Sequence, residues 1–187
     1  VMSKIKTVGI VGTGVIGTGW IIRNLAHNKI VHAYDQNKNL KSYVLKEIRR
    51  TSKSIKKLFG KKILIKNLKF FNSLEKALVN VDFVQESVLE SYKVKTDLIQ
   101  KISKYVKSDV IISSSSSGLL PSKIFSKSKN PQRGIIGHPF NPAYILPAVE
   151  IVPGKKTTKK FLLDANKYYK SISMKPIMLK KELPGYL

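Results

Sequence analysis

Three glycines near the N-terminus constrain the fold more than any other feature of this sequence. They are spaced as Gly12-x-Gly14-x-x-Gly17 and lie between two apolar segments of different period. Residues 8–11 form a short apolar run that is typical of a buried strand, and apolar residues then recur at helical spacing through 15–25. A glycine turn between two such segments predicts a strand, a tight turn and a helix.

The same alternation of strands and helices continues along the chain. Residues 30–34 predict a second strand, so the first three elements form a βαβ unit with parallel strands. Further strands are expected at 68–71, 82–85, 110–112, 135–138, 149–152 and 176–179, and helices at 40–59, 94–106 and 161–172, with a short one from residue 73. The serine run 113–117 is expected to be a loop. The prediction is one α/β domain over residues 1–187, with a Rossmann-type, doubly wound, mostly parallel sheet.

The glycine turn is also the first candidate functional site. Its glycines allow a tight turn, the approach of a pyrophosphate to bare backbone, and close packing of helix on strand. The helix N-terminus adds amide donors and partial positive charge. An ordinary glycine-rich turn is the alternative interpretation. The residues expected to contact a dinucleotide are Gly12, Gly14, Val15, Ile16, Gly17 and Asp35.

Asp35 indicates which dinucleotide is bound. It ends the second predicted strand, 18 residues after Gly17. There a carboxylate can accept hydrogen bonds from an adenosine ribose and repel a 2′-phosphate. NAD is therefore the expected cofactor, although Lys38 and Lys41 nearby leave some room for NADP.

Net charge sets limits on the partners. The chain has 35 Lys and Arg against 11 Asp and Glu, a formal charge of +24, so it attracts polyanions at low salt. Only four of these basic residues are Arg, and the lysines are spread along the whole sequence, whereas nucleic-acid readers concentrate their charge and favour Arg. We expect a solvated basic surface and no specific nucleic acid. Polyanion binding stays open as an alternative.

Cysteine and histidine content excludes several chemistries. The chain has no Cys, which excludes disulfides, thiolate catalysis and Cys-ligated zinc. Its three histidines, His27, His32 and His138, are not grouped as metal ligands, so no metal site is expected. Glycines interrupt the apolar N-terminus, and no run of 18 uncharged apolar residues exists, so we expect no signal peptide and no membrane partner. A cytoplasmic protein is the expectation.

A second candidate site lies late in the sequence. His138 ends the strand expected at 135–138, and Glu150 lies in the strand expected at 149–152. If the loop between them returns, the two side chains meet on neighbouring strands. The carboxylate then fixes the tautomer of the imidazole and stabilises its charged form, which makes the pair a general base. From spacing alone, a histidine and a glutamate unrelated to each other remain the alternative.

These motifs resemble the 3-hydroxyacyl-CoA dehydrogenase superfamily over essentially the whole chain. The segments that carry the resemblance are 12–17, 90–95, 117–122, 137–142 and 146–152. The resemblance implies that the His138–Glu150 pair is catalytic and that Ser117 contacts the substrate oxygen as a third catalytic residue. It also implies cofactor contacts at Glu90, Lys95, Ser117 and Asn141.

Within the superfamily, the amino-acid sequence of three segments resembles the L-carnitine 3-dehydrogenase branch most closely. These segments are residues 85–88, 117–122 and 138–147. This resemblance implies an NAD-dependent oxidation of the 3-hydroxyl of a short hydroxy acid, with L-carnitine as the expected substrate and His138 as the base. Phe140 and Tyr144 are the candidate substrate contacts, because a trimethylammonium group favours aromatic faces. Packing of these two aromatic residues in the core is the alternative.

Two alternative functions stay open. One is a 3-hydroxyacyl-CoA dehydrogenase, in which the Ser and Lys that bind CoA count onto Thr51 and Leu58, with Ser52 and Lys57 one residue away. The other is a catalytically silent NAD-binding module. The family continues into a helical C-terminal domain that forms the dimer. Residues 182–187 resemble the start of the linker to it, so we expect that domain to be absent from this chain and a homodimer where it is present.

Overall fold

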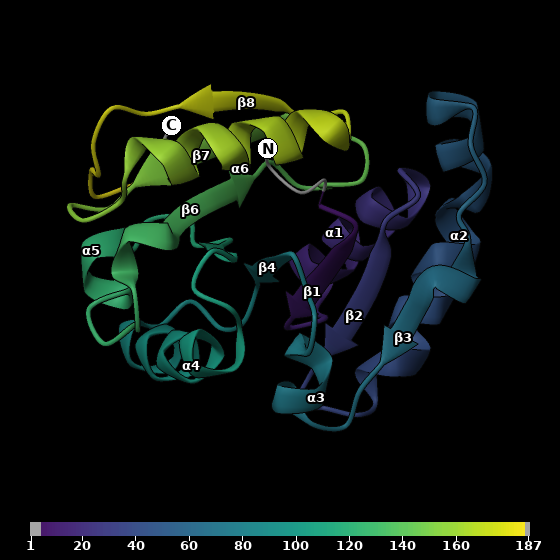
Figure 1. The fold of residues 1–187 in the computed structure, drawn as a ribbon. Coiled ribbons are helices and arrows are strands. Elements are labelled where there is room, and N and C mark those ends of the chain that lie inside the picture. Colours follow the sequence, from purple (N-terminus) through teal and green to yellow (C-terminus); the bar gives the residue numbers. More distant parts are fainter. Residues whose placement is uncertain (1–4, 186–187) are drawn as a thin grey trace.

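The computed structural model describes residues 5–185 and contains one eight-stranded sheet within them. The chain alternates between strands and helices as the sequence predicts (Figure 1). In chain order the elements are β1 (Thr7–Val11), α1 (Val15–Ala26), β2 (Ile30–Tyr34), α2 (Leu40–Phe59), η1 (Ile65–Asn67), β3 (Leu68–Phe70), α3 (Leu74–Leu78), β4 (Phe83–Glu86), α4 (Tyr92–Tyr105), β5 (Ile111–Ser114), α5 (Pro121–Ile124), η2 (Pro131–Arg133), β6 (Gly134–Pro139), β7 (Ala148–Pro153), α6 (Lys159–Ser171) and β8 (Lys175–Met178).

The strand order confirms the doubly wound topology. Across the sheet the strands run β3-β2-β1-β4-β5-β6-β7-β8. The first six strands of the chain are parallel to one another, whereas β7 is antiparallel to β6, and β8 is parallel to β7. The chain builds outward from β1 to β3 and then returns to β4 on the other side of β1. Ligands of open α/β sheets bind beyond the carboxyl ends of the strands at such a reversal.

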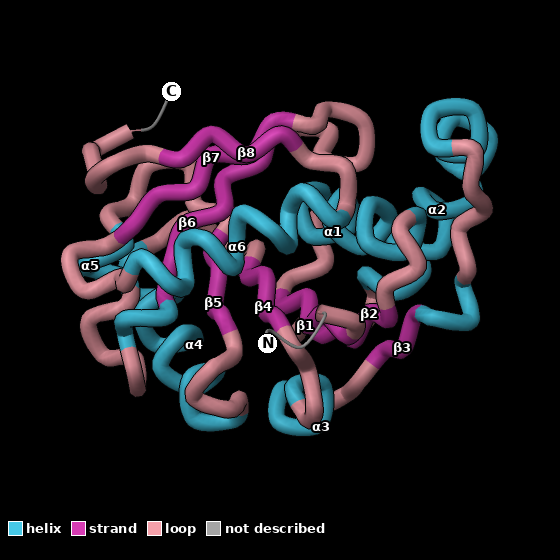
Figure 2. The backbone as a smooth tube through the Cα atoms, turned by 45° about the horizontal axis from the view of Figure 1, so that its top comes forward, coloured by secondary structure: helices cyan, strands magenta, loops and turns pink. Residues whose placement is uncertain are grey.

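Helices cover both faces of the sheet, and each face has its own apolar core. Trp20 of α1, Ile48 of α2 and Tyr169 of α6 belong to one buried cluster, and Ile99 of α4 and Ile124 of α5 belong to the other. Figure 2 shows α1 and α2 above the row of strands β4-β1-β2-β3 and α3 below it. Strands buried on both faces need apolar residues at successive positions, which is why they read as short apolar runs in the sequence.

Local signals explain several element ends. The hydroxyls of Ser73 and Ser91 cap α3 and α4 by accepting from the amides of Lys76 and Val94. The helix α2 ends at Phe59, and the next residue, Gly60, caps it with a φ of 64°, a left-handed conformation that favours glycine. The short elements α5, η1 and η2 were not predicted, because four or fewer residues carry too little periodicity to be recognised.

The serine run corrects one expectation. We expected residues 113–117 to be a loop, but Ser113 and Ser114 are buried residues of β5. Their hydroxyls are satisfied inside the protein, because Ser113 bonds to the hydroxyl of Tyr169 and Ser114 donates to Glu86. A buried serine with such a partner is tolerated in a central strand.

Two further expectations concern the end of the chain and membranes. In the segment 182–187 that resembles a linker, residues 186 and 187 lie outside the described residues. The carboxylate of Glu182 accepts from the amide and hydroxyl of Ser122, and residues 179–185 form no helix. Among residues 5–185, no helix is long and apolar enough to cross a bilayer.

Candidate active site

The glycine loop between β1 and α1 is shaped by two glycines and leaves the third open. Gly12 has a φ of 90°, and a Cβ there would lie 2.7 Å from the carbonyl oxygen of Ser87. A Cβ on Gly17 would lie 1.8 Å from the carbonyl oxygen of Gly12. A Cβ on Gly14 would meet nothing within 4 Å. The loop therefore excludes side chains at two positions for its own packing, and at the third position it leaves room for a ligand.

A cavity of about 600 Å³ adjoins this loop. It lies at the carboxyl ends of β1, β2 and β4, and its polar wall includes Asp35. The amides of Thr13 and Asn37 donate to the two carboxylate oxygens of Asp35 at 2.7 and 2.8 Å. The hydroxyl of Thr13 also donates to Oδ2, at 3.3 Å, whereas Oδ1 keeps a second acceptor position, so the carboxylate can still bind a hydroxyl of a ribose. Bare backbone at Gly14 beside a fixed carboxylate fits an adenine dinucleotide.

His138 and Glu150 meet across the antiparallel pair β6–β7. The two residues are directly opposite in the register, and His138 Nδ1 lies 2.6 Å from Glu150 Oε2. Glu150 is fully buried, whereas 18% of the His138 side chain is exposed. The reversal of β7 creates this contact, because an antiparallel neighbour places side chains on one face opposite each other. The carboxylate is therefore held under the ring, and the ring reaches solvent.

A second cavity, of about 280 Å³, brings together five residues named from the sequence. His138 and Ser117 line it, and so do Ile16 from the start of α1 and Glu90 and Lys95 from the segment around the start of α4. Ser87, Val88, Ser115 and Pro139 complete the wall. An imidazole, a hydroxyl, a cation and a carboxylate therefore face one space at the carboxyl edge of the sheet.

A buried carboxylate that sequence reasoning missed holds Lys95 in this wall. Lys95 Nζ lies 2.7 Å from Oε1 of the fully buried Glu86 and 3.6 Å from Oε2 of Glu90. Glu90 Oε1 in turn accepts from the hydroxyl of Ser116 at 2.5 Å and from the amide of Ser117 at 3.0 Å. Each buried charge therefore has a partner, as buried charges require. The only signal in the sequence was an acidic residue at the end of an apolar strand.

The remaining residues named from the sequence are dispersed. Val15 is 59% exposed at the start of α1, and Asn141 is exposed after β6 and lines neither cavity. The ring of Phe140 lies 5.7 Å from that of His138. The hydroxyl of Tyr144 accepts from Nη2 of Arg50 on α2 at 3.2 Å, so this tyrosine faces a cation.

The positions that count onto a CoA site lie along α2. Thr51 is buried, and its hydroxyl donates to the carbonyl oxygen of Glu47 within α2 at 2.8 Å. The hydroxyl of Ser52 donates to the carbonyl oxygen of Ile48 at 2.6 Å. Leu58 is exposed. These two hydroxyls serve the helix itself.

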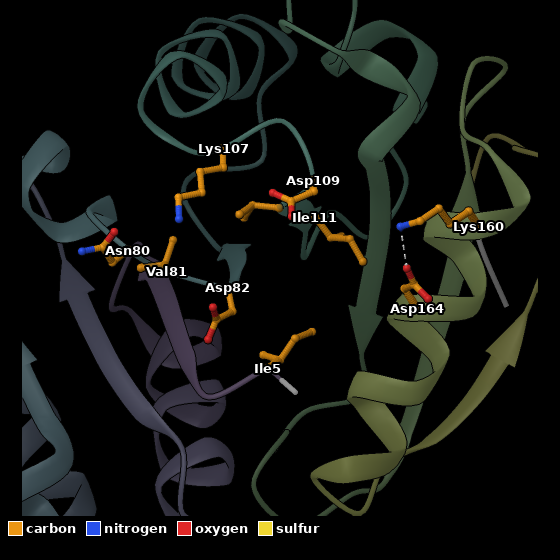
Figure 3. Close-up of a pocket in the computed structure, with 10 residues that line it drawn as sticks. Ile5, Asn80, Val81, Asp82, Lys107, Asp109, Ile111, Lys160 and Asp164 are labelled. Carbon is orange, nitrogen blue, oxygen red and sulfur yellow. Dashed lines mark hydrogen bonds and ion pairs between the residues drawn. The ribbon is translucent and has the colours of Figure 1, made fainter. Parts of the chain in front are cut away.

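A third cavity, of about 610 Å³, lies at the opposite edge of the sheet (Figure 3). It is lined by residues that precede β1, β4 and β5 and by α6. Three of its polar side chains have partners, because Asp82 accepts from the amides of Lys6 and Thr7, and Lys160 pairs with Asp164 at 3.0 Å. None of the residues named from the sequence lines it. Among the described residues no group of three or more His, Cys, Asp or Glu is arranged to hold a metal ion.

Comparison with known proteins decides the family. The family model for "3-hydroxyacyl-CoA dehydrogenase, NAD binding domain" matches residues 7–183. The chain belongs to this family. NAD is therefore the cofactor of this type of domain, as predicted from Asp35 and the glycine loop.

Relatives of this 3-hydroxyacyl-CoA dehydrogenase domain are named enzymes. L-carnitine dehydrogenase of Pseudomonas putida is 40% identical over 187 residues, which are 100% of this chain and 58% of that protein. L-carnitine dehydrogenase of Oceanobacillus iheyensis is 40% identical over 183 residues, 97% of this chain and 60% of that protein. A solved diketoreductase structure has a TM-score of 0.91 at 26% identity and covers 100% of this chain and 68% of its own. The chain thus spans about three-fifths of the length of these curated relatives.

Proposed function

We propose that this chain is the cofactor-binding and base-supplying domain of an NAD-dependent dehydrogenase that oxidises the 3-hydroxyl of L-carnitine. One observation carries the proposal: the His138–Glu150 pair, 2.6 Å apart, stands at a cavity that Ser117, Glu90 and Lys95 also line. The relatives named L-carnitine dehydrogenase support the choice of substrate.

His138 acts as the general base in this proposal. Its Nδ1 donates to the carboxylate of Glu150, since a carboxylate can only accept. In the neutral ring, Nε2 is then the acceptor nitrogen and takes the proton of the substrate hydroxyl. The imidazolium that forms is stabilised by the fully buried carboxylate, which no water screens. General-base catalysis of this type contributes about 10²- to 10⁴-fold in rate.

The other residues of the cavity orient the reactants. Ser117 donates its hydroxyl hydrogen to the substrate oxygen, and its backbone is fixed by Glu90. Lys95 is held by Glu86 and positions the nicotinamide half of the cofactor together with Asn141. When bound, NAD supplies the acceptor for the hydride that leaves the substrate carbon. Orientation of this kind contributes at least as much as proton transfer.

Phe140 is the residue proposed to select the substrate. Its ring lies beside that of His138 and offers an aromatic face to a trimethylammonium group. Tyr144 stays a second candidate, although Arg50 already occupies a position beside its hydroxyl. A CoA ester is the less favoured substrate, because the hydroxyls of Thr51 and Ser52 are bonded within α2.

The curated relatives are longer than the region that they share with this chain. We propose that an extended version, with the helical domain of the family, closes the cavity over the substrate, excludes water and forms a homodimer. A cytoplasmic location remains a prediction.

A turnover panel tests the proposed function. This chain and an extended one are each incubated with NAD and one of four substrates, and the formation of NADH is followed. The substrates are L-carnitine, 3-hydroxybutyryl-CoA, 3-hydroxybutyrate and gulonate. We expect L-carnitine to be the preferred substrate and the extended chain to be faster. A preference for the CoA ester would overturn the choice of substrate. NAD binding without turnover of any substrate by either chain would favour the silent module.

A further inference from the structure

A chain of buried and partly buried hydrogen bonds runs from α6 to the loop after β4. Ser113 Oγ lies 2.8 Å from the hydroxyl oxygen of Tyr169, which lies 2.7 Å from Gln85 Oε1. Gln85 Nε2 lies 2.7 Å from Ser115 Oγ, and Ser115 Oγ lies 2.7 Å from Ser87 Oγ. The proposed mechanism gives no role to any of these residues.

The orientation of the Gln85 amide fixes the first part of this chain. Gln85 Nε2 lies 3.2 Å from the carbonyl oxygen of Gly137, and a carbonyl can only accept, so the atom facing it must be the nitrogen. The amide oxygen therefore faces Tyr169, whose hydroxyl must donate to it. Burial raises the pKa of Tyr169, so this hydroxyl keeps its proton.

The direction of the second part follows from the valence of Ser115. Its hydroxyl oxygen accepts from Gln85 Nε2 and also from the indole nitrogen of Trp20, at 3.0 Å. An indole N–H is only a donor, and a hydroxyl has two acceptor positions and one hydrogen. Both acceptor positions of Ser115 are thus used, and its hydrogen must go to Ser87. The hydroxyl of Ser87 accepts this bond and keeps its own hydrogen for another acceptor.

Ser87 stands at the boundary between the two cavities of the site. It lines the cavity that contains Gly14 and Asp35 and also the cavity that contains His138. Its carbonyl oxygen is the atom that a Cβ on Gly12 would strike, so it packs directly against the glycine loop. Among residues 5–185, the structure gives the hydrogen of Ser87 Oγ no acceptor. A donor therefore ends the chain where a dinucleotide has to pass between the two cavities.

We infer that Ser87 binds the cofactor, by donating its hydroxyl hydrogen to an oxygen of the dinucleotide at the crossing between the cavities. The acceptor belongs to the pyrophosphate or to the adjoining ribose, whose oxygens accept alike. The inference rests on the proposed function of the site. It also makes Trp20, the only tryptophan of the chain, a reporter, since three hydrogen bonds, through Ser115 and Ser87, connect its indole nitrogen to the ligand.

The first arm of the test is NAD binding measured by calorimetry. Ser87→Ala removes the donor and should weaken NAD binding about 3- to 10-fold, the effect of one hydrogen bond. Ser113→Ala is the matched control. It removes a hydroxyl at the far end of the same chain, lines neither cavity, and should bind NAD like the parent.

The second arm follows the single indole N–H signal of Trp20 by ¹⁵N NMR during NAD titration. We expect the signal to shift in the parent and in Ser113→Ala, and to shift less at saturation in Ser87→Ala. Equal NAD affinity of Ser87→Ala and parent, or an indole signal that NAD leaves unmoved in the parent, would overturn the inference while the proposed function stands. A parent that does not bind NAD would overturn both.

Discussion

The glycine loop between β1 and α1 presents backbone to its cavity, whereas β6 presents a side chain, that of His138, which is paired with the buried Glu150 of β7. At the loop, side chains are excluded at Gly12 and Gly17 by contacts of 2.7 and 1.8 Å, and the space beside Gly14 stays open. At β6–β7, the proposed function depends on one imidazole and one carboxylate 2.6 Å apart. The two regions should therefore fail in different ways. Added bulk harms the first, and a change of chemical group harms the second.

The largest effect on activity should come from a change in the His138–Glu150 pair. His138→Gln keeps a polar side chain of similar size but removes the base, so we expect L-carnitine oxidation to fall about 10³-fold or more. NAD affinity should stay close to that of the parent, because the glycine loop and Asp35 are unchanged. Steady-state kinetics and calorimetry measure the two quantities. Equal turnover of variant and parent would refute the mechanism.

The second largest effect should be a loss of NAD binding when the glycine loop is changed. Gly14→Val should lower NAD affinity by more than about 100-fold, because the side chain fills the space that the pyrophosphate needs. The fold should be retained, since a Cβ at this position meets nothing within 4 Å. Gly17→Val is the contrast, because its side chain strikes the backbone of Gly12 and should destabilise the domain. Circular dichroism and calorimetry separate these outcomes, and unchanged NAD binding by Gly14→Val would show that the loop is not the phosphate site.

A smaller loss is expected when only the support of the base is changed. Glu150→Gln keeps the shape of the pair but removes the buried charge that stabilises the imidazolium, so turnover should fall roughly 10- to 100-fold. This is less than the loss from His138→Gln. If the rate with Glu150→Gln matched that of the parent, the carboxylate would have no role in catalysis.

The carboxylate of Asp35, beside the glycine loop, should control the choice between NAD and NADP. Asp35→Ala removes a ribose acceptor and a charge that repels a 2′-phosphate, so NAD affinity should fall about tenfold and the gap between NAD and NADP should narrow. Asp35→Asn keeps the shape at Thr13 and Asn37 and should narrow the gap in the same direction. Dissociation constants for both cofactors measure this, and an unchanged preference would remove the role of Asp35.

The smallest effect concerns acid stability of the N-terminal half. Burial is the largest cause that lowers the pKa of His27 and of His32 below the ordinary value of about 6.5. The unfolded chain therefore takes up protons at a higher pH than the folded chain does. Stability from these residues is present above pH 6.5 and is lost as the pH falls through their lowered values. Thermal unfolding as a function of pH checks this prediction. A melting temperature that does not decrease as the pH is lowered from 6.5 through the pKa values of the two folded histidines would contradict it.

The two regions also differ in what the sequence could predict. The βαβ unit and the glycine loop lie within 35 residues, and their signals are local: an apolar run, a glycine spacing and a helical period. The predicted ranges 30–34 and 40–59 coincide with β2 and α2 for this reason. The fold and the cofactor could therefore be predicted from the sequence.

The other region depends on contacts that no local pattern encodes. The sequence placed His138 and Glu150 on two strands, but only the antiparallel register brings them opposite each other. Glu86, which has Ser114 and Lys95 as partners, and Gln85, which bonds to Tyr169, could not be assigned, because these contacts join separate strands and helices. A buried polar residue interrupts the apolar pattern of its strand, and the sequence alone does not indicate which residue it bonds to.

We expect cofactor binding and base catalysis to reside in separable parts of this domain. Calorimetric titration of NAD into Gly14→Val and His138→Gln, side by side with the parent, tests this expectation most directly. We expect His138→Gln to bind NAD as the parent does, and Gly14→Val, although folded, not to bind it. Loss of NAD binding in both variants, or its retention in both, would contradict the separation.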